Sequence, residues 1–220
     1  MQKWVRNLSP ASEFAVVVLG AFGYFIVISS AVVLGWSSDN PTDAGFKYLI
    51  LHELIVGAVL AIFLLVRGWS LKRIGLAPTL KDTGIGLLLV AGNGVAWGTI
   101  WTLVAAVSQS TVQAAREVIT TLSAAPGTAF WTVALASLVN GTFEETFVCG
   151  YVITALKDRS TPWTAINVSV GVRLLYHSYQ GPIGMMFVVL TGVSIGYWYV
   201  RTGRLWPPIV AHAVIDVLAG

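Results

Sequence analysis

Long apolar segments follow one another along this 220-residue chain and restrict what it can fold into. A helix of about 20 apolar residues is long enough to cross the hydrocarbon core of a bilayer. Charged residues make up only 10% of the chain, whereas soluble domains carry about 25%. The sequence therefore predicts an all-α polytopic membrane helix bundle, in which each helix satisfies its own backbone hydrogen bonds.

About seven transmembrane helices are predicted. Their expected residue ranges are 13–36, 47–66, 83–107, 128–156, 162–179, 183–200 and a last short segment from 205 onward. Between the third and fourth segments, Val112, Ala115, Ile119 and Leu122 recur at helical spacing. That pattern predicts an amphipathic interfacial helix over residues 108–127.

Basic residues gather near the ends of the predicted spans, at residues 3–6, 67–81, 157–159 and 201–204. In a seven-span arrangement these clusters all fall on one side, which the positive-inside rule identifies as the cytoplasm. We therefore expect a protein of the plasma (inner) membrane with a cytoplasmic amino terminus. The net charge of +3 is explained by topology, and no nucleic-acid partner is expected. The single cysteine excludes an intramolecular disulfide and a CxxC metal site.

Two adjacent carboxylates interrupt the fourth predicted span. Glu144 and Glu145 are the only charged residues between Thr128 and Leu156. An ionisable side chain at bilayer depth costs roughly 2.5 to 3.5 kcal/mol on insertion scales. Two such side chains in succession therefore require partners or a function.

The expected partners come from the fifth and last spans. Arg173 and His177 are four residues apart, as are His212 and Asp216, so each pair lies on one helix face. At that spacing Asp216 can orient or charge-stabilise the His212 imidazole. Three helices are thus predicted to present polar groups to a common interior.

Such a cluster is suited to hydrolysis by an activated water. A carboxylate near histidines in a low-dielectric pocket can act as a general base, and the histidines can hydrogen-bond an oxyanion. Zinc is an alternative, because imidazole and carboxylate are ordinary ligands of a catalytic metal. A proton or ion pathway, or a structural ion pair between Arg173 and a glutamate, are the other interpretations of these residues.

These motifs resemble those of the CAAX-protease and bacteriocin-processing membrane peptidases, the CPBP or Abi family. That family carries Glu-Glu-x-x-x-Arg, Phe-x-x-x-His and His-x-x-x-Asn in successive spans. The corresponding segments here are Glu-Glu-Thr-Phe-Val-Cys at 144–149, Arg-Leu-Leu-Tyr-His at 173–177 and His-Ala-Val-Ile-Asp at 212–216. Residues 192–212 also resemble the family closely. The resemblance covers residues 128–218.

Three positions depart from the family pattern: Cys149 replaces the arginine, Arg173 the phenylalanine and Asp216 the asparagine. The first two departures are interpreted together. Arg173, one turn before His177, can supply across a helix interface the charge that the usual arginine supplies along its own helix. Asp216 still accepts hydrogen bonds but adds a negative charge or a titrating proton.

The resemblance implies a role for each residue. Glu144 is expected to activate the water with help from His177, while His212 and Asp216 bind the water and stabilise the oxyanion. Glu145 is expected to be mainly structural. The candidate catalytic set is Glu144, Glu145, His177, His212 and Asp216, with Arg173 as charge partner. No cofactor is required in this interpretation. If the enzyme is instead metal-dependent, the expected zinc ligands are Glu144, His177 and His212.

The sequence thus predicts an intramembrane endopeptidase, of the metallo- or glutamate type, that hydrolyses membrane-associated and in some cases lipidated peptides. Residues 1–82 are expected to form a two-helix membrane region with a basic linker, and residues 83–220 the catalytic bundle. The partners implied are a membrane peptide or protein substrate and the bilayer. A catalytically inactive regulator or chaperone on the same fold, and a proton-coupled carrier, are the alternatives.

Overall fold

The computed structural model describes residues 7–36, 42–113, 116 and 123–219, and the elements it forms in these ranges are all helices. The first three are α2 (Pro10–Val33), α3 (Asp43–Val66) and α4 (Leu80–Val107). The second half contains α6 (Phe130–Glu145), η1 (Thr146–Ile153), α7 (Thr154–Lys157), α8 (Pro162–Tyr176), η2 (Ser178–Gln180), α9 (Gly181–Thr202) and α10 (Trp206–Ala219). The predicted all-α class is confirmed.

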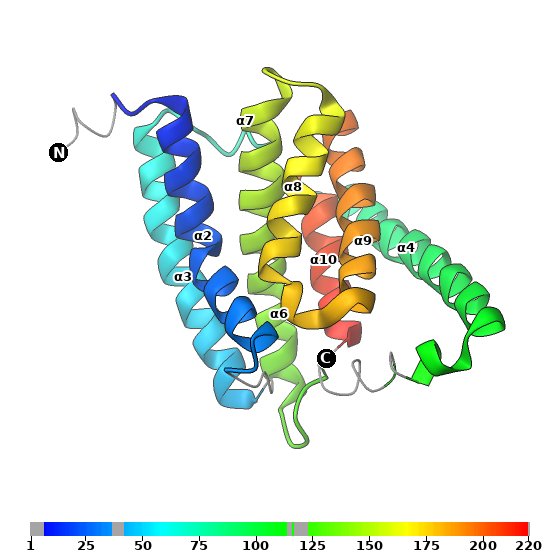
Figure 1. The fold of residues 1–220 in the computed structure, drawn as a ribbon. Coiled ribbons are helices and arrows are strands. Elements are labelled where there is room, and N and C mark those ends of the chain that lie inside the picture. Colours follow the sequence, from blue (N-terminus) through cyan, green and yellow to red (C-terminus); the bar gives the residue numbers. More distant parts are fainter. Residues whose placement is uncertain (1–6, 37–41, 114–115, 117–122, 220) are drawn as a thin grey trace.

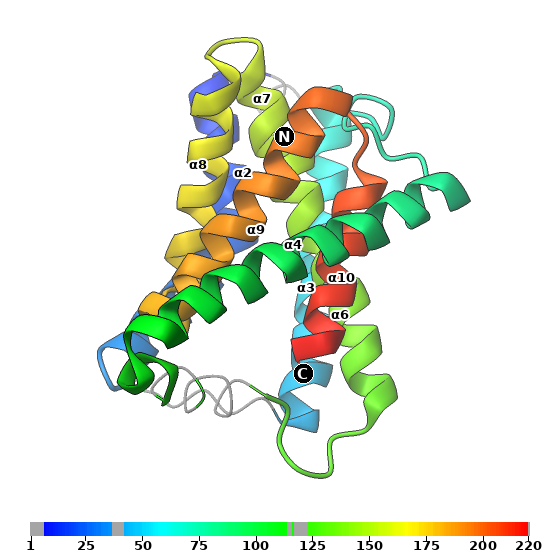
Figure 2. The ribbon, with the colours of Figure 1, turned by 90° about the vertical axis from the view of Figure 1, so that its right-hand side faces the viewer.

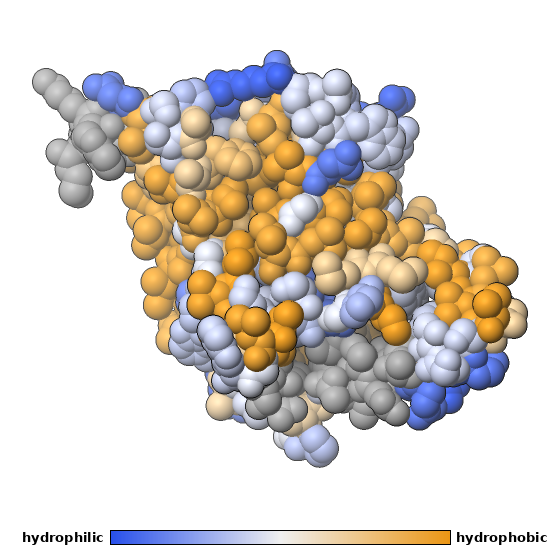
Figure 3. Space-filling model, in the orientation of Figure 1, coloured by the Kyte–Doolittle hydropathy of each residue, from blue (hydrophilic) through white to orange (hydrophobic). Residues whose placement is uncertain are grey.

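Four of the described helical segments are long and apolar enough to cross a membrane: α2, α3, α4 and the segment from Ser178 to Thr202. Many large apolar side chains on them face outward, among them Leu19, Ile62, Leu88 and Val95. Figure 3 shows the resulting hydrophobic band across one face of the molecule, with hydrophilic residues along the upper edge. These helices indicate an integral membrane protein.

By length and apolar composition, four described helical segments qualify as membrane spans, which is fewer than the predicted number of about seven. α8 has 15 residues and α10 has 14, so neither is long enough to count by itself. The fourth predicted span is a continuous helical segment in which α6 changes to the π-helix η1 and then to α7. Within the predicted interfacial helix over residues 108–127, residues 109–113 and 116 are helical and residues 123–127 are not, while residues 114–115 and 117–122 lie outside the described residues.

Side-chain caps define where four helices begin. Thr42, Thr79 and Thr161 each accept the backbone N–H of the residue three positions later, over 3.0 to 3.1 Å. Ser9 caps α2 in the same way. A capping oxygen satisfies one of the backbone donors that the first turn of a helix leaves unpaired. The first and third spans therefore begin three residues earlier than their apolar runs suggest, at Pro10 and Leu80.

The helices form a bundle with one arm that leans outward. α2 and α3 lie side by side along one flank, and they pack against α8 and α6, respectively (Figure 1). α10 packs between α4 and α6. α4 crosses the bundle obliquely, and its carboxyl-terminal part diverges from α9 and α10 (Figures 1 and 2).

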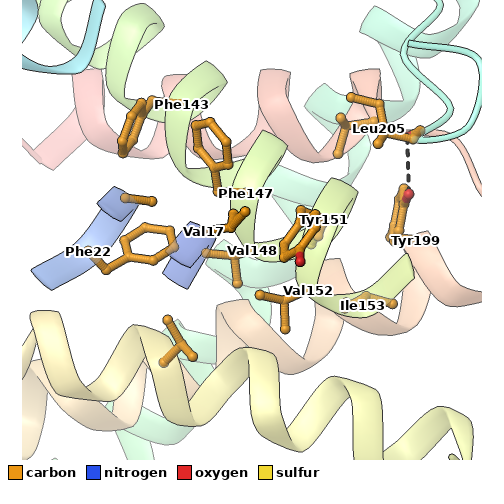
Figure 4. Packing of buried hydrophobic residues seen from close by; sticks show 14 of the residues in the cluster. Val17, Phe22, Phe143, Phe147, Val148, Tyr151, Val152, Ile153, Tyr199 and Leu205 are labelled. Carbon is orange, nitrogen blue, oxygen red and sulfur yellow. Dashed lines mark hydrogen bonds between the residues drawn. The ribbon is translucent and has the colours of Figure 1, made fainter. Parts of the chain in front are cut away.

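The hydrophobic core surrounds η1. Every residue from Phe147 to Ile153 is buried, and the rings of Phe22 and Phe143 lie on the same side as the Phe147 ring of this segment (Figure 4). A π-helical segment closes its hydrogen bonds one residue later than an α-helix, and such segments are frequent at functional sites. Here it begins directly after Glu145, so the paired glutamates sit at the point where the helix changes its winding.

The linker after α3 fixes the start of α10. The Leu205 N–H donates to the Gly75 carbonyl, and the Tyr199 hydroxyl donates to the Ile74 carbonyl, each over 3.0 Å. Gly75 has a φ of 68°, and a Cβ at this position would lie 1.7 Å from the Gly203 carbonyl oxygen. Only glycine fits such a contact. The linker thereby holds the turn that precedes the helix carrying His212.

Candidate active site

Three helices bring the predicted residues into one buried cluster. The end of α6 supplies both glutamates, the end of α8 supplies the arginine and the first histidine, and the middle of α10 supplies the remaining two residues. Glu145 is fully buried, and Glu144, Arg173 and His212 are each less than 10% exposed. The residues that meet here are Glu144, Glu145, Arg173, His177, His212 and Asp216.

Glu145 is held by a cation and by an imidazole. Arg173 Nη2 donates to both carboxylate oxygens, over 2.7 Å each. His212 Nδ1 lies 2.7 Å from Oε1 of the same carboxylate. The Cys149 sulfur lies 3.8 Å from Arg173 Nη2, so the guanidinium lies beside the position that the family's usual motif arginine occupies in the sequence. Buried charges need this kind of pairing, because an isolated one would be strongly destabilising.

Glu144 faces the two histidines. Its Oε2 is 3.7 Å from His177 Nε2 and 3.8 Å from His212 Nε2, beyond direct hydrogen-bond distance. Arg173 Nη1 lies 3.7 Å away, and the Tyr176 hydroxyl donates a short hydrogen bond to the same oxygen. Glu144 therefore has a neighbouring cation and one direct donor, with both imidazoles near the same oxygen.

The two histidines are oriented by different partners. His177 ends α8, and the Gln180 amide lies 3.3 Å from its Nδ1. A donor at Nδ1 leaves the ring proton on Nε2, which faces Glu144. His212 Nδ1 is held by Glu145, so its Nε2 faces Glu144 and lies 3.5 Å from Asp216 Oδ1. The imidazole is thus held chiefly by Glu145, and the predicted orienting residue Asp216 contacts it only at the longer distance.

Asp216 has a partner that sequence reasoning missed. The Asn140 amide donates to Asp216 Oδ2 over 2.8 Å. Asn140 lies one helical turn before Glu144 on α6, and this spacing is the signal that could have revealed it. Tyr176 was also missed, although it directly precedes His177 in the sequence.

A small cavity adjoins the cluster on the side of α9. It has a volume of about 70 Å³ and is lined by His177, His212 and Asp216, together with Arg173, Gln180 and Thr191. One water needs roughly 10 to 15 Å³ of such space. The cavity is therefore large enough for several waters or for a small polar group of a ligand.

The described residues contain no group of three or more histidine, cysteine, aspartate and glutamate side chains arranged to hold a metal ion. The atoms that come closest to forming a metal site are Glu144 Oε2 and the Nε2 atoms of His177 and His212, which face it. The Arg173 guanidinium lies 3.7 Å from that carboxylate oxygen. A fixed cation at this distance would repel a divalent metal ion.

A membrane helix bundle with a buried carboxylate facing two imidazoles has the arrangement expected of a membrane-embedded hydrolase. Residues 126–218 match the family model described as "Type II CAAX prenyl endopeptidase Rce1-like". This segment is a domain of the Rce1-like family, whose members are peptide hydrolases. No curated protein and no solved structure matches the chain. The family match contains all six residues of the cluster.

Proposed function

We propose that this protein is an intramembrane endopeptidase that hydrolyses peptide bonds with a water activated by Glu144. One observation carries the proposal: Glu144 Oε2 faces the Nε2 atoms of His177 and His212 at 3.7 and 3.8 Å. Polar groups at that separation are commonly bridged by water, and a water placed off the lines between these atoms contacts all three.

In the proposed reaction, Glu144 takes a proton from the water while the water oxygen attacks the carbonyl carbon of the peptide. His177 orients that water through its Nε2–H. The new C–O bond gives a tetrahedral intermediate with a negative oxygen. Collapse of the intermediate breaks the C–N bond, and the proton held by Glu144 passes to the leaving amine.

The second histidine stabilises the negative oxygen. In this mechanism His212 carries a proton on each ring nitrogen, with Nδ1–H donating to Glu145 and Nε2–H facing the reacting oxygen. Asp216 lies beside that nitrogen and is itself fixed by Asn140. Donors that are held in place before the reaction stabilise a developing oxyanion without reorganisation. Glu145 and Arg173 act as positioning residues, because Glu145 holds the His212 imidazole and Arg173 lies beside both carboxylates.

The proposed mechanism operates without a resident metal. The position of Arg173 supports this choice, because it places a positive charge where a zinc ion would have to approach Glu144. If zinc were bound, Glu144, His177 and His212 would hold it, and it would supply Lewis-acid activation of the water.

The topology that we propose has about seven spans, with α6–η1–α7, α8 and α10 crossing together with the four long apolar helices. The amino terminus and the 157–159 loop then face the cytoplasm, at the plasma (inner) membrane. A cysteine that replaces Asp158 should react with a membrane-impermeant thiol reagent only from the cytoplasmic side, because the native Cys149 is buried. Labelling from the opposite side would reverse the orientation.

The deciding experiment is cleavage of a quenched-fluorescent peptide library, lipidated peptides included, by the purified protein. We expect cleavage that survives a zinc chelator. Loss of cleavage on chelation, restored by added zinc, would make the three side chains metal ligands. A folded protein that cuts nothing would favour a non-proteolytic regulator or chaperone. Proton or solute flux in liposomes without cleavage would favour a carrier.

A further inference from the structure

Glu53 of α3 is a buried carboxyl group that the proposed reaction does not use. Its residue is only 2% exposed, and neither of its oxygens has a hydrogen-bond partner among the described residues. It lies within electrostatic range of Glu144, His212 and Asp216. Buried polar groups without a partner are rare and destabilising. An unpaired carboxyl beside a candidate active site therefore suggests a binding role.

The same carboxyl lines a long apolar groove. The groove runs between α3 and the α6–η1 segment, has a volume of about 620 Å³ and reaches the linker at Trp69 and Leu71. Among the described residues that line it, Glu53 is the only charged one. Pockets of roughly 300 to 1,000 Å³ with few, convergent polar groups are typical ligand sites. Glu53 supplies that polar group at the end away from the linker.

Small residues form the middle of the α3 wall of the groove. Gly57, Ala58 and Ala61 face it across from Phe143, whose ring would lie 3.4 Å from a Cβ at Gly57. Small residues allow another backbone to approach a membrane helix closely. Along α3 the groove extends from Glu53 to Leu65, which corresponds to about 18 Å at the helical rise.

We propose that this groove binds an extended apolar peptide segment, and that Glu53 hydrogen-bonds the backbone of that segment. The inference rests on the proposed function and names its substrate class: an apolar peptide entering from the bilayer. A length of about 18 Å accommodates about five residues in extended conformation at roughly 3.3 Å each. Glu53 then lies at the end of the bound segment that is nearest to Glu144.

A peptide fits this chemistry better than a hydrocarbon chain does. A peptide brings N–H and C=O groups into the bilayer that must find partners there. A carboxyl group accepts through its oxygens and, when protonated, also donates, so it can pair with both. A lipid tail offers neither group and would leave Glu53 buried and unsatisfied.

The test measures binding without cleavage. A fluorophore-labelled, end-capped apolar peptide of that length is titrated into purified protein carrying Glu144→Gln, and into the same protein with a second substitution. Glu53→Leu should weaken binding of the peptide about tenfold, the usual size of one lost buried hydrogen bond, whereas Glu53→Gln should stay close to the parent. A labelled long-chain alkyl probe is titrated in parallel.

Two further variants separate the groove from a general effect on α3. Ala61→Phe fills the groove and should abolish peptide binding, while Val59→Phe, which changes a residue outside the groove that is 60% exposed, should not. The proposal would be overturned if the peptide bound the Glu53→Leu and Ala61→Phe variants as tightly as it binds the parent protein. An alkyl probe that binds more tightly to Glu53→Leu while the peptide does not bind at all would also overturn it. Because no cleavage is needed, a Glu53-dependent complex would stand even if the protein proved not to be a peptidase.

Discussion

Glu144→Gln is expected to reduce peptide cleavage about 100- to 10,000-fold while the protein stays folded, since a general base typically contributes 10² to 10⁴ in rate. Glutamine has nearly the same shape and still accepts the hydrogen bond from Tyr176. It cannot take a proton from water. The measurement is kcat on the best library peptide, together with the melting temperature of the detergent-solubilised protein.

Glu145→Gln, at the neighbouring position, should lower the stability of the protein, whereas Glu144→Gln should lower its cleavage rate. Glu145→Gln leaves the Arg173 guanidinium buried without its carboxylate, and breaking a buried pair on one side costs about 3 to 5 kcal/mol. We therefore expect a large fall in melting temperature and in yield. Two adjacent glutamates would thus separate into one that affects rate and one that affects stability.

Asp216→Asn is the matched control, because it restores the residue usual in the family and keeps the size of the side chain. Its cleavage rate should stay within about tenfold of the wild type, as the amide can still face His212 and Asn140. Equal cleavage by wild type and Glu144→Gln would remove Glu144 from the reaction. If Glu144→Gln lowered the melting temperature as much as Glu145→Gln does, the assignment of Glu144 to rate and Glu145 to stability would be wrong.

The helices were predictable because their signals are local. Apolar runs and threonine caps depend on neighbouring residues, so the ranges for α3 and α8 differ from the sequence-based ones by only a few residues. The change to a π-helix after Glu145 has no comparable local signal. The segment packs against residues that are distant in sequence: a Cβ at Gly150 would lie 3.1 Å from Leu205 and 3.3 Å from Ile74.

The candidate site was only partly predictable for a related reason. Spacing of four residues places Arg173 with His177 and His212 with Asp216, but it does not say which carboxylate each will meet. That depends on how the helices are rotated about their axes, and helices that are apolar on nearly every face carry no periodic signal for that rotation. Tyr176 and Glu53 were missed because a lone tyrosine or glutamate is identified only by what lies across from it.

Replacement of the buried Arg173 is expected to have a second large effect, on the stability of the protein. Arg173→Phe, which introduces the phenylalanine usual at this motif position, removes the partner of Glu145 and should destabilise the protein by about 3 to 5 kcal/mol. The Cys149 sulfur lies 3.8 Å from the guanidinium, so an arginine placed at 149 begins beside the site of the lost charge. It would also stand four residues after Glu145, as in the usual family motif.

The double variant Cys149→Arg with Arg173→Phe is therefore expected to recover at least half of the lost stability, and with it the cleavage activity. The measurement is a double-mutant cycle of melting temperature and kcat on the wild type, the two single variants and the double variant. Cys149→Arg alone should be destabilising, because it crowds two guanidinium groups into one buried site. Arg201→Phe, at an exposed position of α9, controls for the loss of a cation elsewhere. If the double variant were no more stable than Arg173→Phe, the arginine on α8 would not be a relocated copy of the family's motif charge.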